Sequence, residues 1–229
     1  YQGFPYFGSG FVILASENNT TVNIELKGKG GKYSTTTSGK KIGDEWSVTL
    51  NRGQVYVVRG MGNTDGTFDL TGSRIKSDKP IGLLSYHQRA DLPALISSSR
   101  DHLIEMIPPV QSWGKTYASV QYARPPYKGD MMRIVAAENM TTYEVEMYDE
   151  KTGQLIERRD GTLRRSGDFA EISEILGTPG PNTFGVRGLS IVRANKPILV
   201  LQYSYSSSWD GNNDYDPFMI VNTSVEQFT

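Results

Sequence analysis

Apolar and polar side chains alternate in several short segments of the chain. TTVNIEL, which begins at Thr20, and TTYEVEMY, which begins at Thr141, place apolar residues at every second position. A period of two puts one face of a strand on a core and the other face in water. Both segments therefore predict half-buried β-strands.

Continuous apolar runs precede these two segments. GFVILAS and MMRIVAAE predict strands that are central in a sheet, and the polar stretches ENNTT and ENMTT that follow them predict hairpin turns. Further strands are predicted in EWSVTL, QVYVVRG, FDLTGSRIKS, TYASVQYA and LSIVRA. Many short strands separated by turn residues are typical of a β-sandwich.

The two halves of the chain echo each other. ILASENNTTVNIEL from Ile13 pairs with IVAAENMTTYEVEM from Ile134, and IKSDKPIGLL from Ile75 pairs with IVRANKPILV from Ile191. A weaker third pair, DHLIEMIPPVQSWG and DPFMIVNTSVEQFT, follows in the same order. Ordered self-similarity of this kind indicates a tandem duplication.

The predicted fold is all-β, with two tandem homologous β-sandwich units at residues 1–112 and 113–229. The last strand is also compatible with the start of a further unit. One segment predicts a helix instead: DFAEISEILG offers Asp168 as N-cap, Glu171 at the third helical position and Gly177 after the end. The corresponding stretch near Trp46 predicts a strand.

The echoed Lys-Pro phrase predicts a turn followed by a core strand. Asp78 or Asn195 favours the turn, and proline is tolerated where a strand starts because no ladder donor is needed there. We interpret the phrase as structural and not as a catalytic motif.

Three blocks of the sequence resemble a known family. LTGSRIKSDKPIGLLSYH followed by RDHLIEMIPPVQSWGKTY is similar to the signature of the N-terminal domain of IgGFc-binding protein and its bacterial relatives. DPFMIVNTSVEQF resembles a later block of the same family, although Thr223 or Ser224 stands where proline is usual. The resemblance covers about residues 10–228.

This resemblance implies a secreted or cell-surface β-rich module that is part of a longer protein and serves binding or adhesion. Animal members contain cysteine and this chain contains none, so the bacterial branch is the better match. No residue motif in the sequence carries antibody binding, so that property is not transferred.

Composition excludes several classes of chemistry and of binding partner. The chain has 229 residues, no cysteine and a net charge of -1. The lack of cysteine excludes disulfides, thiol catalysis and cysteine-ligated zinc. The balanced charge gives no reason to expect nucleic acid, and no apolar run reaches the roughly 20 residues that span a bilayer. The opening residues lack a signal peptide and predict a mature chain or a segment excised from a longer protein.

An acidic loop predicts a calcium site. Asp210, Asn212, Asp214 and Asp216 alternate in WDGNNDYDP, and hard oxygen ligands at this spacing suit Ca²⁺. The loop lacks the central glycine and distal glutamate of an EF-hand. The alternative interpretation is a solvated acidic turn.

Aromatic residues in loops are the candidate binding residues. Exposed rings stack on sugars or anchor protein partners, and Tyr122, Tyr127, Tyr205 and Trp209 are the candidates. The sequence does not separate exposed rings from buried ones.

Two polar groups of the sequence have simple structural explanations. His87 and His102, the latter beside Asp101 and Glu105, lack a nucleophile or third metal ligand, so structural roles are favoured. IERRDGTLRR predicts a hairpin that turns at Asp160-Gly161, with arginines on both strands as a charged, aggregation-resistant edge or an anionic-glycan contact.

The predicted function is non-enzymatic binding or adhesion outside the cell, with a protein or glycan partner at a cell surface or matrix. One alternative is a carbohydrate-binding module with a calcium loop. Another is the subunit of an extracellular filament, which self-associates by exchanging strands.

Overall fold

The computed structural model describes residues 7–28, 36–62, 69–90, 92, 100–123, 129–173, 185–207 and 215–228. They belong to two compact units. Unit 1 is drawn from Tyr1–Ala90 and Asp101–Pro108, and unit 2 from Asp91–Arg100 and Pro109–Thr229. Regular structure in the described ranges consists of strands and short 3-10 turns, so the predicted all-β class is confirmed.

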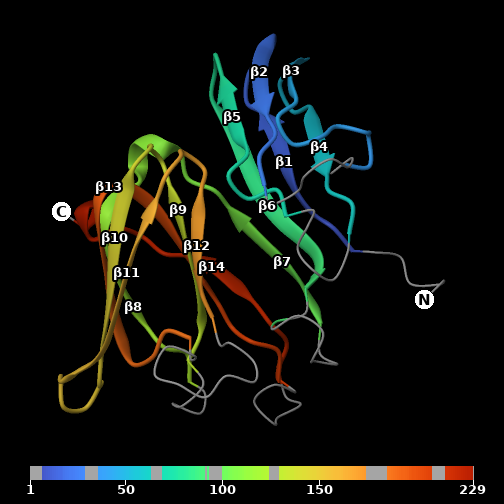
Figure 1. Ribbon diagram of the computed structural model, residues 1–229. Helices are drawn as coiled ribbons and strands as arrows, with labels where there is room; N and C mark the ends of the chain where they lie inside the picture. The colour runs from blue at the N-terminus through green and yellow to red at the C-terminus, as the bar shows by residue number, and fades with distance from the viewer. Residues whose placement is uncertain are drawn as a thin grey trace. The chain divides into compact units, whose positions relative to one another are not determined.

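The described residues of unit 1 form seven strands in two antiparallel sheets (Figure 1). One sheet has the order β4-β1-β6-β7 and the other the order β3-β2-β5. The strands are β1 (Ser9–Ala15), β2 (Thr20–Glu25), β3 (Glu45–Leu50), β4 (Val55–Arg59), β5 (Arg74–Ser77), β6 (Ile81–Ala90) and β7 (Asp101–Met106).

The core of unit 1 lies between its two sheets. The inward residues of β1, such as Ile13, pack with inward residues of β2, such as Val22 and Ile24, and all three are essentially inaccessible to water. Leu50 from β3 and Val58 from β4 complete the cluster. The alternation that predicted half-buried strands therefore has its expected cause in a two-sheet core.

Unit 2 forms one seven-stranded sheet that folds over its own core. The order is β11-β10-β13-β9-β12, and β8 and β14 also pair with β13. The elements are η1 (Val110–Ser112), β8 (Gly114–Val120), β9 (Met131–Ala136), β10 (Thr141–Tyr148), β11 (Leu155–Leu163), β12 (Phe169–Ile172), β13 (Leu189–Tyr203), β14 (Met219–Val221) and η3 (Val225–Gln227).

The long strand β13 serves both halves of this sheet. Its first part pairs with β8 through Arg193 and with β10 through Ala194, and its second part, from Ile198, pairs with β9. The register on β8 shifts between Arg193 and Ile198. The prediction of a turn at Asn195 was therefore wrong, because Asn195 lies inside one continuous strand, in the irregular stretch where β13 changes its pairing partners.

The predicted hairpins at ENNTT and ENMTT are also wrong. β1 pairs with β4 and β6, whereas β2 pairs with β3 and β5, so the link between β1 and β2 carries the chain from one sheet to the other. β9 and β10 are likewise unpaired with each other. Each link ends on a left-handed residue, Asn19 or Met140, both with φ of 53°. The alternation of apolar and polar residues correctly predicted where the strands lie, but it carries no information about which strands pair.

Polar contacts fix the corner of unit 1. The Asn18 side chain accepts a hydrogen bond from the backbone N–H of Arg52 at 3.1 Å, and its carbonyl accepts one from the Lys79 ammonium at 2.6 Å. The Asp78 carboxylate accepts the N–H of Thr21 at 2.8 Å. The echoed phrase thus supplies two side chains that hold the corner.

The corner of unit 2 is held by the same set of contacts. The Asn139 side chain accepts the N–H of Ser166 at 2.8 Å, and its carbonyl accepts the Lys196 ammonium at 2.7 Å. The Asn195 side chain accepts the N–H of Thr142 at 2.9 Å. These contacts give the Lys-Pro phrase a structural role in both units.

Two local predictions fail on the strands of unit 2. Phe169–Ile172, predicted to be helical, forms β12 and pairs with β9, and Arg133 of β9 binds Glu171 at 2.8 Å. The predicted turn at Asp160-Gly161 lies inside β11, where Gly161 is opposite Tyr143. In both cases pairing with a distant strand overrides a short local signal.

Candidate functional site

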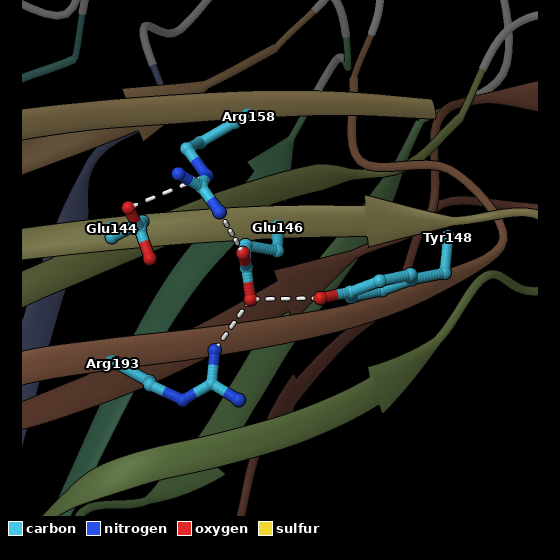
Figure 2. Close-up of polar contacts among 5 residues, drawn as sticks. All are labelled: Glu144, Glu146, Tyr148, Arg158 and Arg193. Carbon is cyan, nitrogen blue, oxygen red and sulfur yellow. Dashed lines mark hydrogen bonds and ion pairs between the residues drawn. The ribbon is translucent and has the colours of Figure 1, made fainter. Parts of the chain in front are cut away.

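A cluster of charged side chains lies on the outer face of unit 2. Glu144, Glu146 and Tyr148 alternate with core residues along β10, so they share the face directed away from the core. Arg158 of β11 is directly opposite Glu146, and Arg193 of β13 is opposite Glu144. Figure 2 shows the side chains of Tyr148, Arg158 and Arg193 converging on the carboxylate of Glu146, with Glu144 joined to Arg158.

Three donors bind the Glu146 carboxylate. Arg158 donates from Nη2 to Oε1, Arg193 donates from Nη1 to Oε2 at 2.5 Å, and the Tyr148 hydroxyl donates to Oε2 at 2.8 Å. Arg158 also reaches Glu144 through Nε at 3.4 Å. We call these five residues the Glu146 cluster.

The electrostatics of the cluster keep Glu146 ionised. The hydrogen bonds from Tyr148, Arg158 and Arg193 lower the pKa of Glu146 to about 2. The same contact with Glu146 raises the pKa of Tyr148 above its usual value, so this tyrosine remains a hydrogen-bond donor. A carboxylate with this pKa and three bound donors is unsuited to general acid or base chemistry at neutral pH. Its role is to position the two guanidinium groups.

The arginines face solvent while the carboxylate does not. The side chains of Arg158 and Arg193 are 53% and 50% exposed, against 9% for Glu146. Arginine carries five N–H donors, so each group retains donors for an external acceptor after binding Glu146. The cluster therefore holds two guanidinium groups in fixed positions at the surface of unit 2.

Exposed aliphatic side chains surround the Glu146 cluster on the same sheet face. On β11, Leu155 is opposite Tyr148 and Ile156 stands at the adjoining register shift, and Leu189 of β13 pairs with both Tyr148 and Val120. Ile156, Leu189 and Val120 are all exposed. Arginine, tyrosine and aliphatic residues on one rigid face are typical of protein contact surfaces.

A second carboxylate binds arginines on the other face of β11. Glu157 accepts hydrogen bonds from Arg159 at 2.6 Å and from Arg187 at 3.0 Å. β11 is the terminal strand in the order β11-β10-β13-β9-β12, so the predicted charged edge agrees with the sheet order, although Arg158 and Arg159 lie on opposite faces of the strand.

Sequence reasoning missed Glu146. A glutamate on the polar side of an alternating strand resembles any solvated residue. The available signal was the arginine-rich segment that follows, since a strand with glutamates at alternate positions matches one with an arginine on the same face. Assigning β11 as the next strand was needed, and the predicted turn at Asp160-Gly161 prevented it.

Unit 1 has an apolar outer face on the sheet β4-β1-β6-β7. Registered pairs place Leu14 beside Val55, Val57 level with Val12, and Met106 beside Leu84. Leu14, Val55, Val57, Ile104 and Met106 are between 45% and 58% exposed. Apolar residues grouped in this way mark a contact surface more often than scattered ones do.

The predicted calcium loop falls almost wholly outside the described residues. Asp210, Asn212 and Asp214 lie there, and Asp216 is exposed just before β14. Among the described ranges, no group of three or more acidic, histidine or cysteine residues is arranged to hold a metal ion. The calcium site stays a prediction.

The four predicted aromatic binding residues separate. Trp209 and Tyr127 lie outside the described residues, and Tyr205 is completely buried, which leaves its ring no surface for a ligand. Tyr122 is partly buried, and its ring centroid lies 4.5 Å from that of Phe218. Its backbone N–H donates to the buried carboxylate of Asp130 at 2.8 Å. Of the two candidates that the structure describes, Tyr122 is the one that keeps some exposed area.

The two histidines lie in unit 1. His102 contacts Asp101 through Nδ1 at 2.9 Å, and His87 accepts the N–H of Arg89 at 3.1 Å. Burial raises the pKa of the nearby Glu105 carboxyl.

We also find no helix in the described part of the chain with the length and apolar character needed to cross a membrane.

Comparison with known proteins places these features in a family. The family model described as IgGFc binding protein matches residues 1–229. Human IgGFc-binding protein is 30% identical over 109 residues, which cover 47% of this chain and 2% of the human protein. The chain therefore spans a small part of that relative's length. No solved structure matches. Because the family model covers the whole sequence, this chain belongs to the IgGFc-binding protein family.

Proposed function

We propose that this chain is a non-enzymatic binding module of a larger secreted or cell-surface protein, and that it binds an acidic protein surface through the Glu146 cluster. The observation that carries the proposal is the arrangement of Arg158 and Arg193, which are half exposed and held by a shared carboxylate. Because Glu146 fixes both side chains before a partner arrives, binding loses less side-chain entropy.

The surroundings of the cluster favour a protein partner. Ile156, Leu189 and Val120 supply exposed apolar area beside the arginines. A surface that combines aliphatic residues with fixed arginines suits a folded protein with acidic groups near its own apolar patch.

The human relative's printed name makes the Fc fragment of IgG the first partner to test. The chain would be immobilised, and human Fc would be passed over wild type and over Arg158→Ser, Arg193→Ser and the double variant. We expect the double variant to weaken binding about tenfold or more, because each arginine loses a charge-assisted contact.

Arg52→Ser is the matched control, since Arg52 is exposed in unit 1 and only its backbone N–H has a described hydrogen bond. Its affinity should equal that of wild type. Fc binding that survives the double variant would overturn the assignment to this face. Failure of Fc to bind would remove Fc as the partner, and a panel of acidic extracellular proteins would replace it.

We also propose that the two units are copies of one ancestral domain. The support is the shared set of corner contacts, in which Asn18 and Asn139 accept equivalent hydrogen bonds and Lys79 and Lys196 bind the equivalent carbonyls.

Calcium-dependent glycan binding, the second candidate function, rests on the sequence of residues 210–216. It is tested by the calcium experiment below.

A further inference from the structure

The matched sheets of the two units differ at one edge. In unit 1 the order is β3-β2-β5, and in unit 2 it is β11-β10-β13 with β8 added beyond the first part of β13. β5 pairs with β2 alone among the described residues. The position that β8 fills in unit 2 therefore has no described strand in unit 1.

The hydrogen-bonding groups of β5 can be assigned to its two sides. Asp78 donates its N–H to Thr21 of the β2 side at 3.2 Å. Backbone groups of an antiparallel strand alternate in direction, so Lys76 and Arg74 also face β2. Ile75 and Ser77 consequently direct their N–H and C=O groups away from β2, toward the edge.

In unit 2, the strand β8 covers the corresponding edge and helps to bury the core residues there. Tyr117 of β8 is opposite Val192 of β13, and its hydroxyl donates to the Ile198 carbonyl at 2.5 Å. Val192 is completely inaccessible to water. Ile75 takes the equivalent place in unit 1, opposite Ile24, and is only partly buried against the core. An aromatic side chain opposite Ile75 would complete that burial.

Charge defines the rest of the partner. Arg74 and Lys76 are exposed on the outer face, and neither has an ion pair among the described residues. Arg193, by contrast, is bound by Glu146, and the β8 residue opposite it is the uncharged Thr116. The β5 edge therefore favours acidic residues on either side of the aromatic one. A second copy's β5 would place like charges opposite one another, which is destabilising.

We propose that the outer edge of β5 binds an extended acidic segment of a partner polypeptide as an added antiparallel strand, with an aromatic residue opposite Ile75. This mode supplies affinity through main-chain hydrogen bonds and specificity through alternate side chains. The site is separate from the Glu146 cluster and does not depend on it.

A peptide based on β8 tests the proposal with the full chain. The probe has the sequence of residues 113–122 with Thr116→Glu and Ala118→Glu, and it is titrated into ¹⁵N-labelled protein. We expect shifts centred on the amides of Ile75 and Ser77, with slowed hydrogen exchange at Ile75. A peptide with Lys in place of both Glu residues should bind about fivefold more weakly.

Three controls separate strand addition from adventitious contact. N-methylation of the peptide's tyrosine removes a ladder donor and should weaken binding about tenfold. Lys76→Glu should abolish the preference between the acidic and basic peptides, because the new carboxylate offsets the charge of Arg74. Arg52→Glu, an equal charge change elsewhere in unit 1, should leave the preference unchanged.

Other results would overturn the proposal. These are the absence of shifts at Ile75 at millimolar peptide, equal binding of the N-methylated peptide, or shifts centred elsewhere. Protection of Ile75 that grows with protein concentration alone would make a second copy the occupant and reject the acidic partner. Arg158→Ser and Arg193→Ser should leave peptide binding intact, so failure of the proposed function would be recognised separately.

Discussion

Tyr117 offers a direct measure of how firmly β8 is joined to unit 2. The side chain is 2% exposed, and its hydroxyl both donates to the Ile198 carbonyl and accepts the N–H of Gly114 at 3.2 Å. Burial raises its pKa, which keeps the hydroxyl protonated as a donor. Replacement by phenylalanine removes both hydrogen bonds and leaves the ring in place.

The expected loss follows from these two contacts. A buried polar group left without its partner costs about 1–3 kcal/mol, and taking both affected groups at the low end we expect Tyr117→Phe to reduce the free energy of unfolding by about 2 kcal/mol. For a chain of this size, 1 kcal/mol corresponds to about 2–4 °C in melting temperature. The melting temperature should therefore fall by about 4–8 °C.

Differential scanning calorimetry of wild type and variant measures this change. Tyr148→Phe is the matched control, because it removes a hydroxyl whose acceptor, Glu146, keeps two arginine donors. Its melting temperature should change by less than about 2 °C. Equal shifts in the two variants, or a shift below about 1 °C for Tyr117→Phe, would refute the reasoning.

Three further predictions concern other features of the chain. The folded pKa of Glu146 is about 2, below its usual 4.5, so its stabilisation is present above pH 4.5 and is lost as the pH falls toward 2. Acid titration of unfolding should show a shallower loss in Glu146→Gln than in wild type. Met140 has a left-handed φ of 53° and is 60% exposed, and asparagine tolerates this conformation better than methionine. Met140→Asn should therefore raise the free energy of unfolding by about 0.5–1 kcal/mol, as measured from the midpoint of urea unfolding. If the acidic loop binds calcium, a hundredfold excess over the dissociation constant should stabilise wild type by about 2.7 kcal/mol, and Asp214→Ala should not respond to calcium or chelator.

The strands were predictable because their cause is local. Alternation in TTVNIEL and TTYEVEMY follows from a core on one side, and it located β2 and β10 well. Strand partners were not predictable, because the links at Asn19 and Met140 can join paired strands or cross between sheets with the same turn residues. The helix expected from Asp168 failed for a similar reason, since pairing with β9 is invisible to a local capping pattern.

The candidate site was predictable only in part. The arginine-rich segment was recognised, but the partner of Arg158 is on the preceding strand and that of Arg193 is 47 residues away. Such a cluster requires the register of three strands before its members can be brought together. Tyr205 shows the converse limit, because an aromatic residue near a loop gives no sign of whether its ring is buried.

The shared strand β13 also sets the order in which unit 2 can be completed during synthesis. β8, β9 and β10 all precede it in the chain, and each pairs with it directly. Among the described strands, β10 with β11 and β9 with β12 are the pairs that can join before β13 leaves the ribosome. A nascent chain stopped before Leu189 therefore lacks the common partner of three strands. The sheet of unit 2 is therefore completed only when β13 has been synthesised, whereas in unit 1 the corresponding pairings are divided between two strands, β5 and β6.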